Sequence, residues 1–211
     1  MLMIFRGFCP NCGGDIDSER LAKGLPCRKC LPNLDLFSAS LRGYERVAWV
    51  KERLLDNDSL RGYWSIARQF EELRDFEEFF TRLTSFRLWN IQRSWAKRLL
   101  NRENFALIAP TGVGKSTLLM TYALYRASKE LSKVIFMVPT VELVKQTYSK
   151  LVVLNNKLCS EVLIISTTEL RGDKKGFILN AMKSKEPSII VMTNNFFSRN
   201  LKSEVVNGGL F

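Results

Sequence analysis

Residues 104–117 read NFALIAPTGVGKST, and this stretch decides the fold of the chain. The apolar run at 105–109 predicts a buried parallel strand, and the helical pattern from Lys115 predicts a helix directly after it. Between them, Gly112 and Gly114 let the backbone wrap closely around phosphate oxygens and point its N–H groups at them. A strand, a glycine-rich turn and a helix in this order make a P-loop match specific, so we predict a nucleotide-binding α/β fold.

The residues of this motif have distinct predicted roles. Lys115 neutralises the β and γ phosphates of ATP, and Ser116, or alternatively Thr117, supplies a hydroxyl ligand to Mg²⁺, so Lys115 and Ser116 are the catalytic candidates. The motif opens with Ala109 where the common P-loop has glycine, which is similar to the A-x-T-G-x-G-K-[ST] form of superfamily 2 helicases. The predicted ATP-binding set is Gln92, Ala109, Pro110, Thr111, Gly112, Val113, Gly114, Lys115, Ser116 and Thr117.

Short apolar runs alternate with helical patterns after the P-loop. The runs at 134–138, 162–166 and 188–193 are rich in β-branched residues and predict further buried parallel strands. The segments between them predict helices at 115–130, 141–154 and 176–185. We therefore expect a RecA-like parallel sheet, present in part, with helices on both faces.

The segments before the P-loop have a different character. Apolar residues recur at helical spacing from Tyr44 to Leu83, with a break near 57–62, which predicts two helices. A basic amphipathic helix is predicted from Gln92 to Leu100. We therefore divide the chain into a four-cysteine zinc ribbon at 1–40, a helical connector at 41–88 and an ATP-binding domain at 89–211.

Four cysteines are arranged as two CxxC knuckles, Cys9 with Cys12 and Cys27 with Cys30, separated by fourteen residues. Each knuckle presents two thiolates from a tight turn, and two facing knuckles form the closed tetrahedral sulfur site that structural zinc prefers. The alternatives are a pair of disulfides or a redox CxxC motif. The doubled spacing favours one structural Zn²⁺ ion.

Basic residues also lie in and near the ribbon. Arg28 and Lys29 are inside the second knuckle, with Arg6 and Arg20 nearby in the sequence. These side chains either contact phosphates or form a solvated basic surface, and the sequence leaves both interpretations open.

The overall charge favours a polyanionic partner. The chain has 32 basic and 21 acidic residues, a formal net charge of +11, so nucleic acid is the first candidate and a membrane surface the second. No apolar stretch approaches the roughly 20 residues of a membrane span, and the N-terminus lacks the features of a secretory signal. We expect a cytoplasmic protein with no membrane partner. The chain contains no histidine, which excludes imidazole as a base or metal ligand.

Three segments around the P-loop resemble helicase motifs. Gln92 lies seventeen positions before Ala109 and resembles the Q-motif glutamine that reads adenine, although a glutamine on a helix is usually a plain surface residue. The segment VPTVELVKQTYSKL at 138–151 resembles motif Ia, which implies a DNA phosphate contact at Thr140. The segment SIIVMTNNFFSRNL at 188–201 resembles the next DNA-contacting region, with Thr193 at the strand end.

The order of these features, from the ribbon at Cys9 through APTGVGKST to about Leu201, resembles reverse gyrase. In that family two RecA-like domains are fused to a type IA topoisomerase, and together they introduce positive supercoils using ATP. The resemblance implies double- and single-stranded DNA as partners and a hyperthermophilic source.

The sequence departs from this family after the last predicted strand. The family continues into an acidic DD-x-D segment, whereas this sequence reads KSEVVNGGLF at 202–211. We therefore expect an N-terminal fragment that needs the remainder of the helicase-like and topoisomerase domains, and that alone hydrolyses ATP negligibly. The alternative is a free-standing zinc-ribbon and P-loop module that binds nucleic acid without catalysis.

Overall fold

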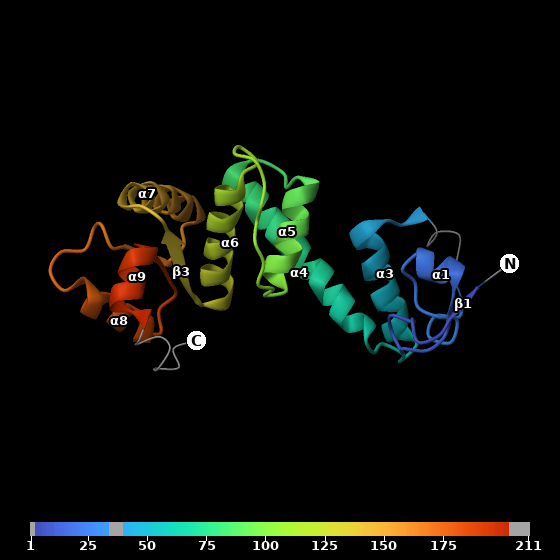
Figure 1. Cartoon of the computed structure of the whole chain (residues 1–211). Helices are drawn as coiled ribbons and strands as arrows, with labels where there is room; N and C mark the ends of the chain where they lie inside the picture. The colour runs from blue at the N-terminus through green and yellow to red at the C-terminus, as the bar shows by residue number, and fades with distance from the viewer. Residues whose placement is uncertain (1–2, 34–39, 203–211) are drawn as a thin grey trace. The chain divides into compact units, whose positions relative to one another are not determined.

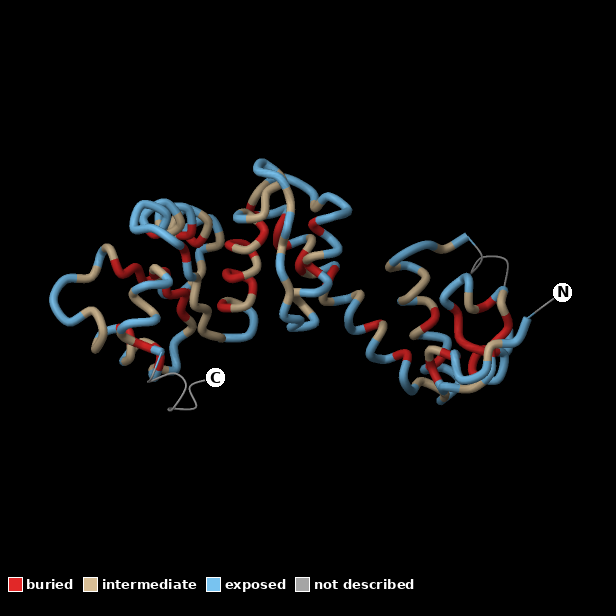
Figure 2. Tube along the Cα trace, viewed as in Figure 1, coloured by how far each residue is buried: buried red, intermediate tan, exposed pale blue. Residues whose placement is uncertain are grey.

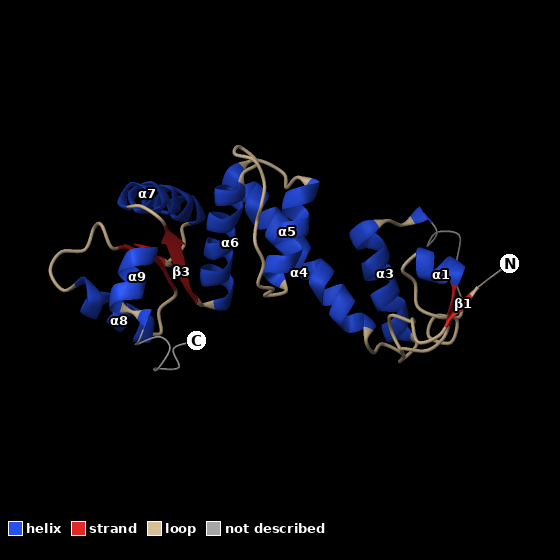
Figure 3. Ribbon diagram, in the orientation of Figure 1, coloured by secondary structure: helices blue, strands red, loops and turns tan. Residues whose placement is uncertain are grey.

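A computed structural model describes residues 3–33 and 40–202 of the 211-residue chain. Figure 1 shows the course of the chain, and Figure 3 separates helices, strands and loops. The chain divides into two compact units, the first formed by Met1–Asp75 with Leu100–Glu103 and the second by Phe76–Leu99 with Asn104–Phe211. We call them the ribbon unit and the P-loop unit. None of the helices in the described part of the chain is both long and apolar enough to cross a membrane.

The ribbon unit combines a small two-stranded sheet with helices. Strand β1 (Ile4–Phe5) pairs antiparallel with β2 (Ile16–Asp17), and helix α1 (Ser18–Ala22) follows β2 directly. Two longer helices complete the unit, α3 (Gly43–Asp56) and the start of α4 (Tyr63–Thr84). The two helices confirm the prediction of a helical pair with a break at 57–62.

The core of the ribbon unit contains cysteine in positions where a larger domain has aliphatic side chains. Cys9, Cys27 and Cys30 are buried in one cluster together with Val50 and Leu54 of α3. Figure 2 shows buried stretches in the loops of the ribbon and along α3. A core this small supplies little hydrophobic stabilisation, so the sulfur atoms hold a central place in the fold.

The P-loop unit contains the remaining elements. These are the second part of α4, then α5 (Asn90–Leu100), α6 (Lys115–Glu130), β3 (Lys133–Val138), α7 (Val141–Leu158), β4 (Leu163–Ser166), α8 (Lys174–Lys183), β5 (Ser188–Thr193) and α9 (Asn194–Asn200). The predicted helix at 115–130 and the predicted strand at 188–193 have the predicted bounds. The other predicted strands, 134–138 and 162–166, differ by one residue at the start, and α7 extends four residues beyond its predicted end.

The strands form a parallel sheet in the order β3-β5-β4. Strand β5 is central, and its first five residues are buried because both neighbours and both faces are covered. Side chains alternate between the faces: Ile190 and Met192 pack in one cluster with Ile178 and Met182 of α8. Figure 1 shows α7 on one side of the sheet and α8 and α9 on the other, which confirms the predicted helix-covered parallel sheet.

An aromatic cluster joins α4 to α6. The Phe76 ring is fully buried and meets the rings of Tyr122 and Tyr125 edge to face, with centroid separations of 6.0 and 5.3 Å. Phe79 meets Tyr125 in the same way at 5.3 Å. Such pairs add to the free energy gained from apolar burial, so α4 is held firmly against the helix that follows the P-loop.

The predicted strand at 105–109 is wrong: the structure assigns this segment to a loop, and none of the described strands pairs with it. Its apolar character is plain, yet the side chain of Ile108 is 90% exposed. A strand exists only with a hydrogen-bonded neighbour, and an apolar sequence cannot supply that neighbour by itself.

Candidate nucleotide site and metal centre

The P-loop depends on the backbone freedom of two glycines. Gly112 and Gly114 have φ angles of +87° and +79°, in the left-handed region that L side chains rarely adopt. Gly114 caps the N-terminus of α6, and a Cβ atom there would lie 2.6 Å from Nε2 of Gln92. The backbone conformation therefore requires glycine at position 114, and a Cβ atom there would also displace the Gln92 amide.

Lys115 is folded back onto the loop. Its Nζ donates hydrogen bonds to the carbonyl oxygens of Ala109, at 2.6 Å, and Pro110, at 2.7 Å. The first turn of α6 contains no acidic residue, so the ammonium group and the helix N-terminus carry positive charge in the same place. A bound phosphate would find a cation and helix N–H groups here, which is the arrangement that P-loops use.

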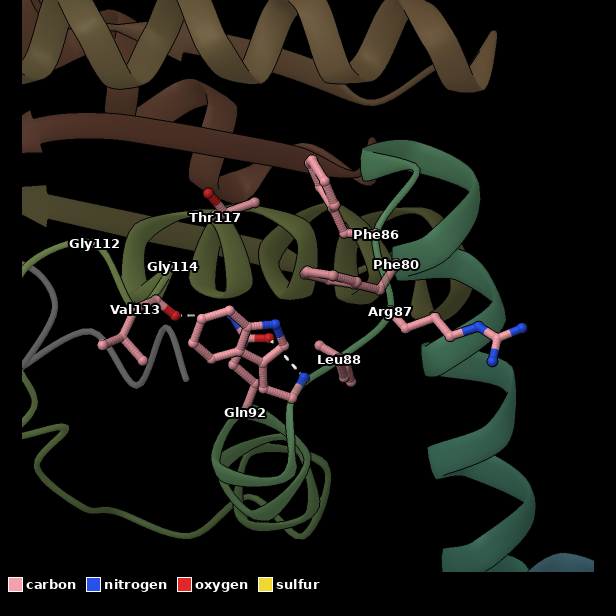
Figure 4. Close-up of a pocket in the computed structure, with 10 residues that line it drawn as sticks. Phe80, Phe86, Arg87, Leu88, Gln92, Gly112, Val113, Gly114 and Thr117 are labelled. Carbon is pink, nitrogen blue, oxygen red and sulfur yellow. Dashed lines mark hydrogen bonds between the residues drawn. The ribbon is translucent and has the colours of Figure 1, made fainter.

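Gln92 joins α5 to the P-loop. It is 6% exposed, its Oε1 accepts a hydrogen bond from the Trp89 N–H at 3.0 Å, and its Nε2 donates one to the Val113 carbonyl at 2.9 Å. Figure 4 shows both hydrogen bonds. Gln92 therefore ties the loop before α5 to the phosphate loop, twenty-one residues away in the sequence.

A cavity of about 510 Å³ opens beside these residues, within the size range of ligand pockets. Its lining consists of Phe80, Phe86, Arg87, Leu88, Trp89, Gln92, Gly112, Val113, Gly114 and Thr117. In Figure 4 the side chains of Phe80, Phe86 and Leu88 lie near the loop, whereas Arg87 points away. An apolar, aromatic wall next to a phosphate-binding loop fits a nucleotide whose base stacks on the aromatic rings.

The other predicted ATP-binding residues divide between the cavity and the surface. Val113 and Thr117 line the cavity, whereas the side chains of Thr111 and Ser116 are exposed to solvent. The aromatic residues Phe80 and Phe86 were not among the predicted site residues. The only sequence signal for Phe80 and Phe86 is the aromatic character of the segment shortly before Gln92. Their side chains reach the cavity because α4 packs on α6, which no local pattern indicates.

The predicted DNA contacts Thr140 and Thr193 lie at one edge of the sheet. Strand β3 ends in register with Thr193 of β5, and Thr140 follows β3 by two residues. Each is the N-cap of a helix: Thr140 Oγ1 accepts a hydrogen bond from the Leu143 N–H, and Thr193 Oγ1 accepts one from the Phe196 N–H. Each hydroxyl keeps its own hydrogen for donation to a partner.

Positive charge is concentrated in the P-loop unit. That unit contains 19 basic and 9 acidic residues, a net charge of +10, whereas the ribbon unit contains 13 and 12, a net charge of +1. The electrostatic attraction for a polyanion therefore comes from the P-loop unit.

The four predicted zinc ligands converge in the ribbon unit. The sulfur atoms of Cys9, Cys12, Cys27 and Cys30 all lie within 4.8 Å of one another, and all four are free thiols. Cys27 Sγ is 3.7 Å from Cys12 Sγ and 3.8 Å from Cys30 Sγ. A tetrahedral zinc ion with sulfur at 2.3 Å needs ligands about 3.8 Å apart, so these thiols fit a structural zinc ion.

The thiols differ in how readily they lose their protons. Burial acts to raise the pKa of Cys9, but the backbone N–H groups of Cys12, Cys27 and Asn11 point at its sulfur and lower the pKa to about 6. Burial raises the pKa of Cys30 to about 12 and also raises that of Cys27. Of these three buried thiols, Cys9 therefore most easily becomes the thiolate that a metal requires.

One of the basic residues of the ribbon cannot reach a phosphate. Arg20 is 6% exposed, and its guanidinium donates hydrogen bonds to the carbonyl oxygens of Pro26, Leu31 and Pro32. Both interpretations, a phosphate contact and a solvated basic surface, are wrong for Arg20, because this buried side chain holds the loop around the second knuckle. Arg28 is exposed and pairs with Asp17 at 3.2 Å.

Comparison with known proteins agrees with both sites. Residues 1–43 match the family described as reverse gyrase zinc finger, and residues 89–209 match DEAD/DEAH box helicase. Among curated proteins, the chain is 38% identical over 196 residues to reverse gyrase 2 of Aeropyrum pernix, 36% over 200 residues to reverse gyrase of Methanocaldococcus jannaschii and 34% over 212 residues to reverse gyrase of Thermococcus kodakarensis.

These matches cover 93%, 94% and 100% of the chain but only 15%, 12% and 12% of the respective relatives, so the chain spans less than a sixth of their length. The helicase match alone covers more than half of the chain. The chain therefore belongs to the DEAD/DEAH box helicase family, and it corresponds in sequence to the zinc finger and helicase-like region of reverse gyrases.

Proposed function

We propose that the chain is the ATP- and DNA-binding N-terminal region of a reverse gyrase, an ATP-dependent type IA topoisomerase that introduces positive supercoils into DNA. The observation that carries the proposal is the glycine-dependent P-loop, joined through Gln92 to an aromatic-lined cavity of about 510 Å³. The names of its relatives support the same proposal.

The residues around the cavity have separate roles in nucleotide binding. Phe80 and Phe86 provide apolar surface for the base, and the N–H groups of the loop from Ala109 to Gly114 receive the phosphates. Lys115 exchanges its two carbonyl partners for phosphate oxygens, and Ser116 or Thr117 offers a hydroxyl to Mg²⁺. In such proteins Mg²⁺-dependent hydrolysis of ATP supplies the free energy for the work on DNA.

Gln92 has two proposed roles, because its amide bonds to the P-loop and also faces the adenine base. Its Nε2 has a second hydrogen besides the one donated to Val113, and that hydrogen can reach a base. The same amide therefore holds the P-loop in place and contributes to the recognition of adenine.

Turnover by the 211-residue chain should be negligible. The sequence contains no DD-x-D segment, and hydrolysis in this fold needs a carboxylate to organise metal and water, together with charge stabilisation from a second domain. The proposed partners are therefore the remaining helicase-like and topoisomerase domains and DNA. The proposed location is the cytoplasm.

DNA binding is assigned to the carboxyl edge of the sheet. Thr140 follows strand β3 by two residues and Thr193 ends the neighbouring strand β5, so both hydroxyls can donate hydrogen bonds to phosphates of one DNA strand. The net charge of +10 on the P-loop unit supplies the sequence-independent part of the affinity for single- and double-stranded DNA.

The test is binding of a fluorescent ATP analogue with Mg²⁺ to the intact chain and to Lys115→Ala. Loss of a charge-assisted interaction of about 1.5–3 kcal/mol predicts a Kd higher by roughly 10- to 100-fold. Lys150→Ala is the matched control, because it removes the same charge from an exposed position on α7. Equal binding by all three proteins would contradict the proposed site.

A second measurement addresses catalysis. We expect no DNA-stimulated ATP hydrolysis by the zinc-loaded chain at concentrations that saturate binding. A robust rate of ATP hydrolysis would contradict the proposal that hydrolysis requires the carboxylates of a DD-x-D segment. Binding of ATP and DNA, with a reading frame that lacks topoisomerase segments, would instead support the free-standing module.

A further inference from the structure

Asn11 lies inside the first cysteine knuckle, between Cys9 and Cys12, and is an asparagine with only 3% exposure. A polar amide is buried at little cost only when its donors and acceptors are satisfied. Three hydrogen-bond partners of the Asn11 side chain lie about fifty residues away, in the turn that connects α3 to α4, and no feature of the local sequence indicates them.

Both the nitrogen and the oxygen of the Asn11 side-chain amide form hydrogen bonds with this turn. Nδ2 donates a hydrogen bond to the Ser59 carbonyl at 2.7 Å. Oδ1 accepts hydrogen bonds from the N–H groups of Arg61, at 2.8 Å, and Tyr63, at 3.3 Å. One side chain therefore satisfies three backbone groups of the turn and of the start of α4, which otherwise have no helical partner.

The backbone of the knuckle contacts the turn as well. The Gly62 N–H donates a hydrogen bond to the Asn11 carbonyl at 2.9 Å. A Cβ atom at Gly62 would lie 3.1 Å from that oxygen and 3.2 Å from the Pro10 carbonyl. The knuckle and the turn are therefore in direct contact, with little room for a side chain at Gly62.

The same turn also reaches the second knuckle. Ser59 Oγ donates a hydrogen bond to the Cys30 carbonyl at 3.0 Å. The turn thus bridges the two knuckles, through Asn11 on one side and Cys30 on the other. A zinc ion held by the four sulfurs would bring the same two knuckles together from within.

We propose that Asn11 is a positioning residue that couples the metal centre to the α3–α4 turn. A loaded metal site holds the knuckles in the geometry that binds the turn, and the docked turn in return slows release of the metal. This mutual effect is required by linkage, since two interactions that favour the same arrangement of the knuckles stabilise each other. The proposal concerns zinc retention and does not depend on the proposed topoisomerase activity.

The first test measures release of Zn²⁺ from the full chain to an excess of a chromophoric chelator. Residues that orient metal ligands typically change metal affinity by about 10- to 100-fold, so Asn11→Ala should release zinc at least about tenfold faster than the unmodified chain. Gly62→Ala should also accelerate release, because it pushes the turn away while leaving every knuckle residue unchanged. Gln69→Ala, which shortens an exposed side chain further along α4, is the matched control.

The second test is amide hydrogen exchange at Arg61, Gly62 and Tyr63. In the unmodified chain these amides should be protected with zinc and lose at least about tenfold of that protection after chelation. Unchanged zinc release in Gly62→Ala, or amides that stay protected after zinc removal, would overturn the proposal. Because Gly62→Ala alters no knuckle residue, the proposal remains testable if Asn11→Ala fails to fold.

Discussion

The two units of this chain are stabilised in different ways. In the ribbon unit, three of the four clustered cysteines are buried among a few apolar side chains, and the sulfur cluster occupies the centre. In the P-loop unit, a three-stranded parallel sheet and an aromatic cluster between α4 and α6 form a conventional core. The ribbon unit therefore has four thiols that fit a zinc ion beside a small apolar core, whereas the P-loop unit has a larger apolar core.

The two units also differ in charge. The ribbon unit is nearly neutral at +1, although both of its knuckles have basic neighbours, whereas the P-loop unit carries +10. One of the ribbon arginines, Arg20, is buried in a structural role and another, Arg28, is paired with Asp17. Counting basic residues in a short motif therefore overestimates its affinity for phosphates, because acidic neighbours and internal hydrogen bonds reduce it.

Removal of zinc should produce the largest difference in stability between the ribbon unit and the P-loop unit. Metal coordination contributes roughly 10–16 kcal/mol in zinc-finger peptides, as much as the whole stability of a small domain. A strong chelator should therefore remove amide protection from the ribbon at 3–33 while β3, β4 and β5 stay protected. Cys27→Ser should have the same effect without a chelator. A ribbon that keeps its protection after zinc is lost would show that its apolar core suffices.

The aromatic cluster is the corresponding test of the P-loop unit. Phe76→Ala removes a fully buried ring that meets Tyr122 and Tyr125, so we expect a loss of about 3–5 kcal/mol in unfolding free energy. Urea unfolding followed by circular dichroism measures the change. Phe177→Ala, at a position 49% exposed on α8, should cost much less. Equal losses would mean that the cluster does not stabilise the unit.

Alanine substitutions at two glycines with similar backbone angles separate the effect of backbone strain from the effect of a contact between side chains. Gly114 and Gly172 have φ angles of +79° and +70°, so alanine at either position should cost about 1–2 kcal/mol of stability. Only at Gly114 would the new Cβ meet another group, Nε2 of Gln92. Gly114→Ala should therefore also weaken binding of the ATP analogue, whereas Gly172→Ala should leave it unchanged. Equal affinities in the two variants would argue against the Gln92 contact as a part of the site.

The smallest expected effect concerns the difference in charge. Lys145→Ala with Arg199→Ala removes two exposed charges from α7 and α9, the helices that Thr140 and Thr193 cap. If both contact phosphates, the slope of log affinity against log salt should fall by about 2. The ribbon pair Arg28→Ala with Lys29→Ala should change the slope by less than about 1. A larger change for the ribbon pair would place the DNA contacts on the ribbon unit.

Local sequence patterns predicted much of the fold. The bounds of the helix at Lys115–Glu130, the break between α3 and α4 and three of the four strands after the connector follow from patterns a few residues long. The clustering of the four cysteines also follows from the sequence, because each knuckle brings two sulfurs together through a short turn. The glycines of the P-loop belong to the same class, since their backbone angles are a property of the loop itself.

Contacts between distant segments were not accessible to that reasoning. The apolar run at 105–109 pairs with none of the strands in the described residues, Gln92 bonds to Val113, and Asn11 bonds to a turn about fifty residues away. The sequence by itself determined which residues are candidates for binding phosphate and metal, because that choice depends on side-chain chemistry and local backbone freedom. Only the tertiary structure decided which hydrogen bonds hold those residues in place, because a donor finds its acceptor only after the intervening chain has folded.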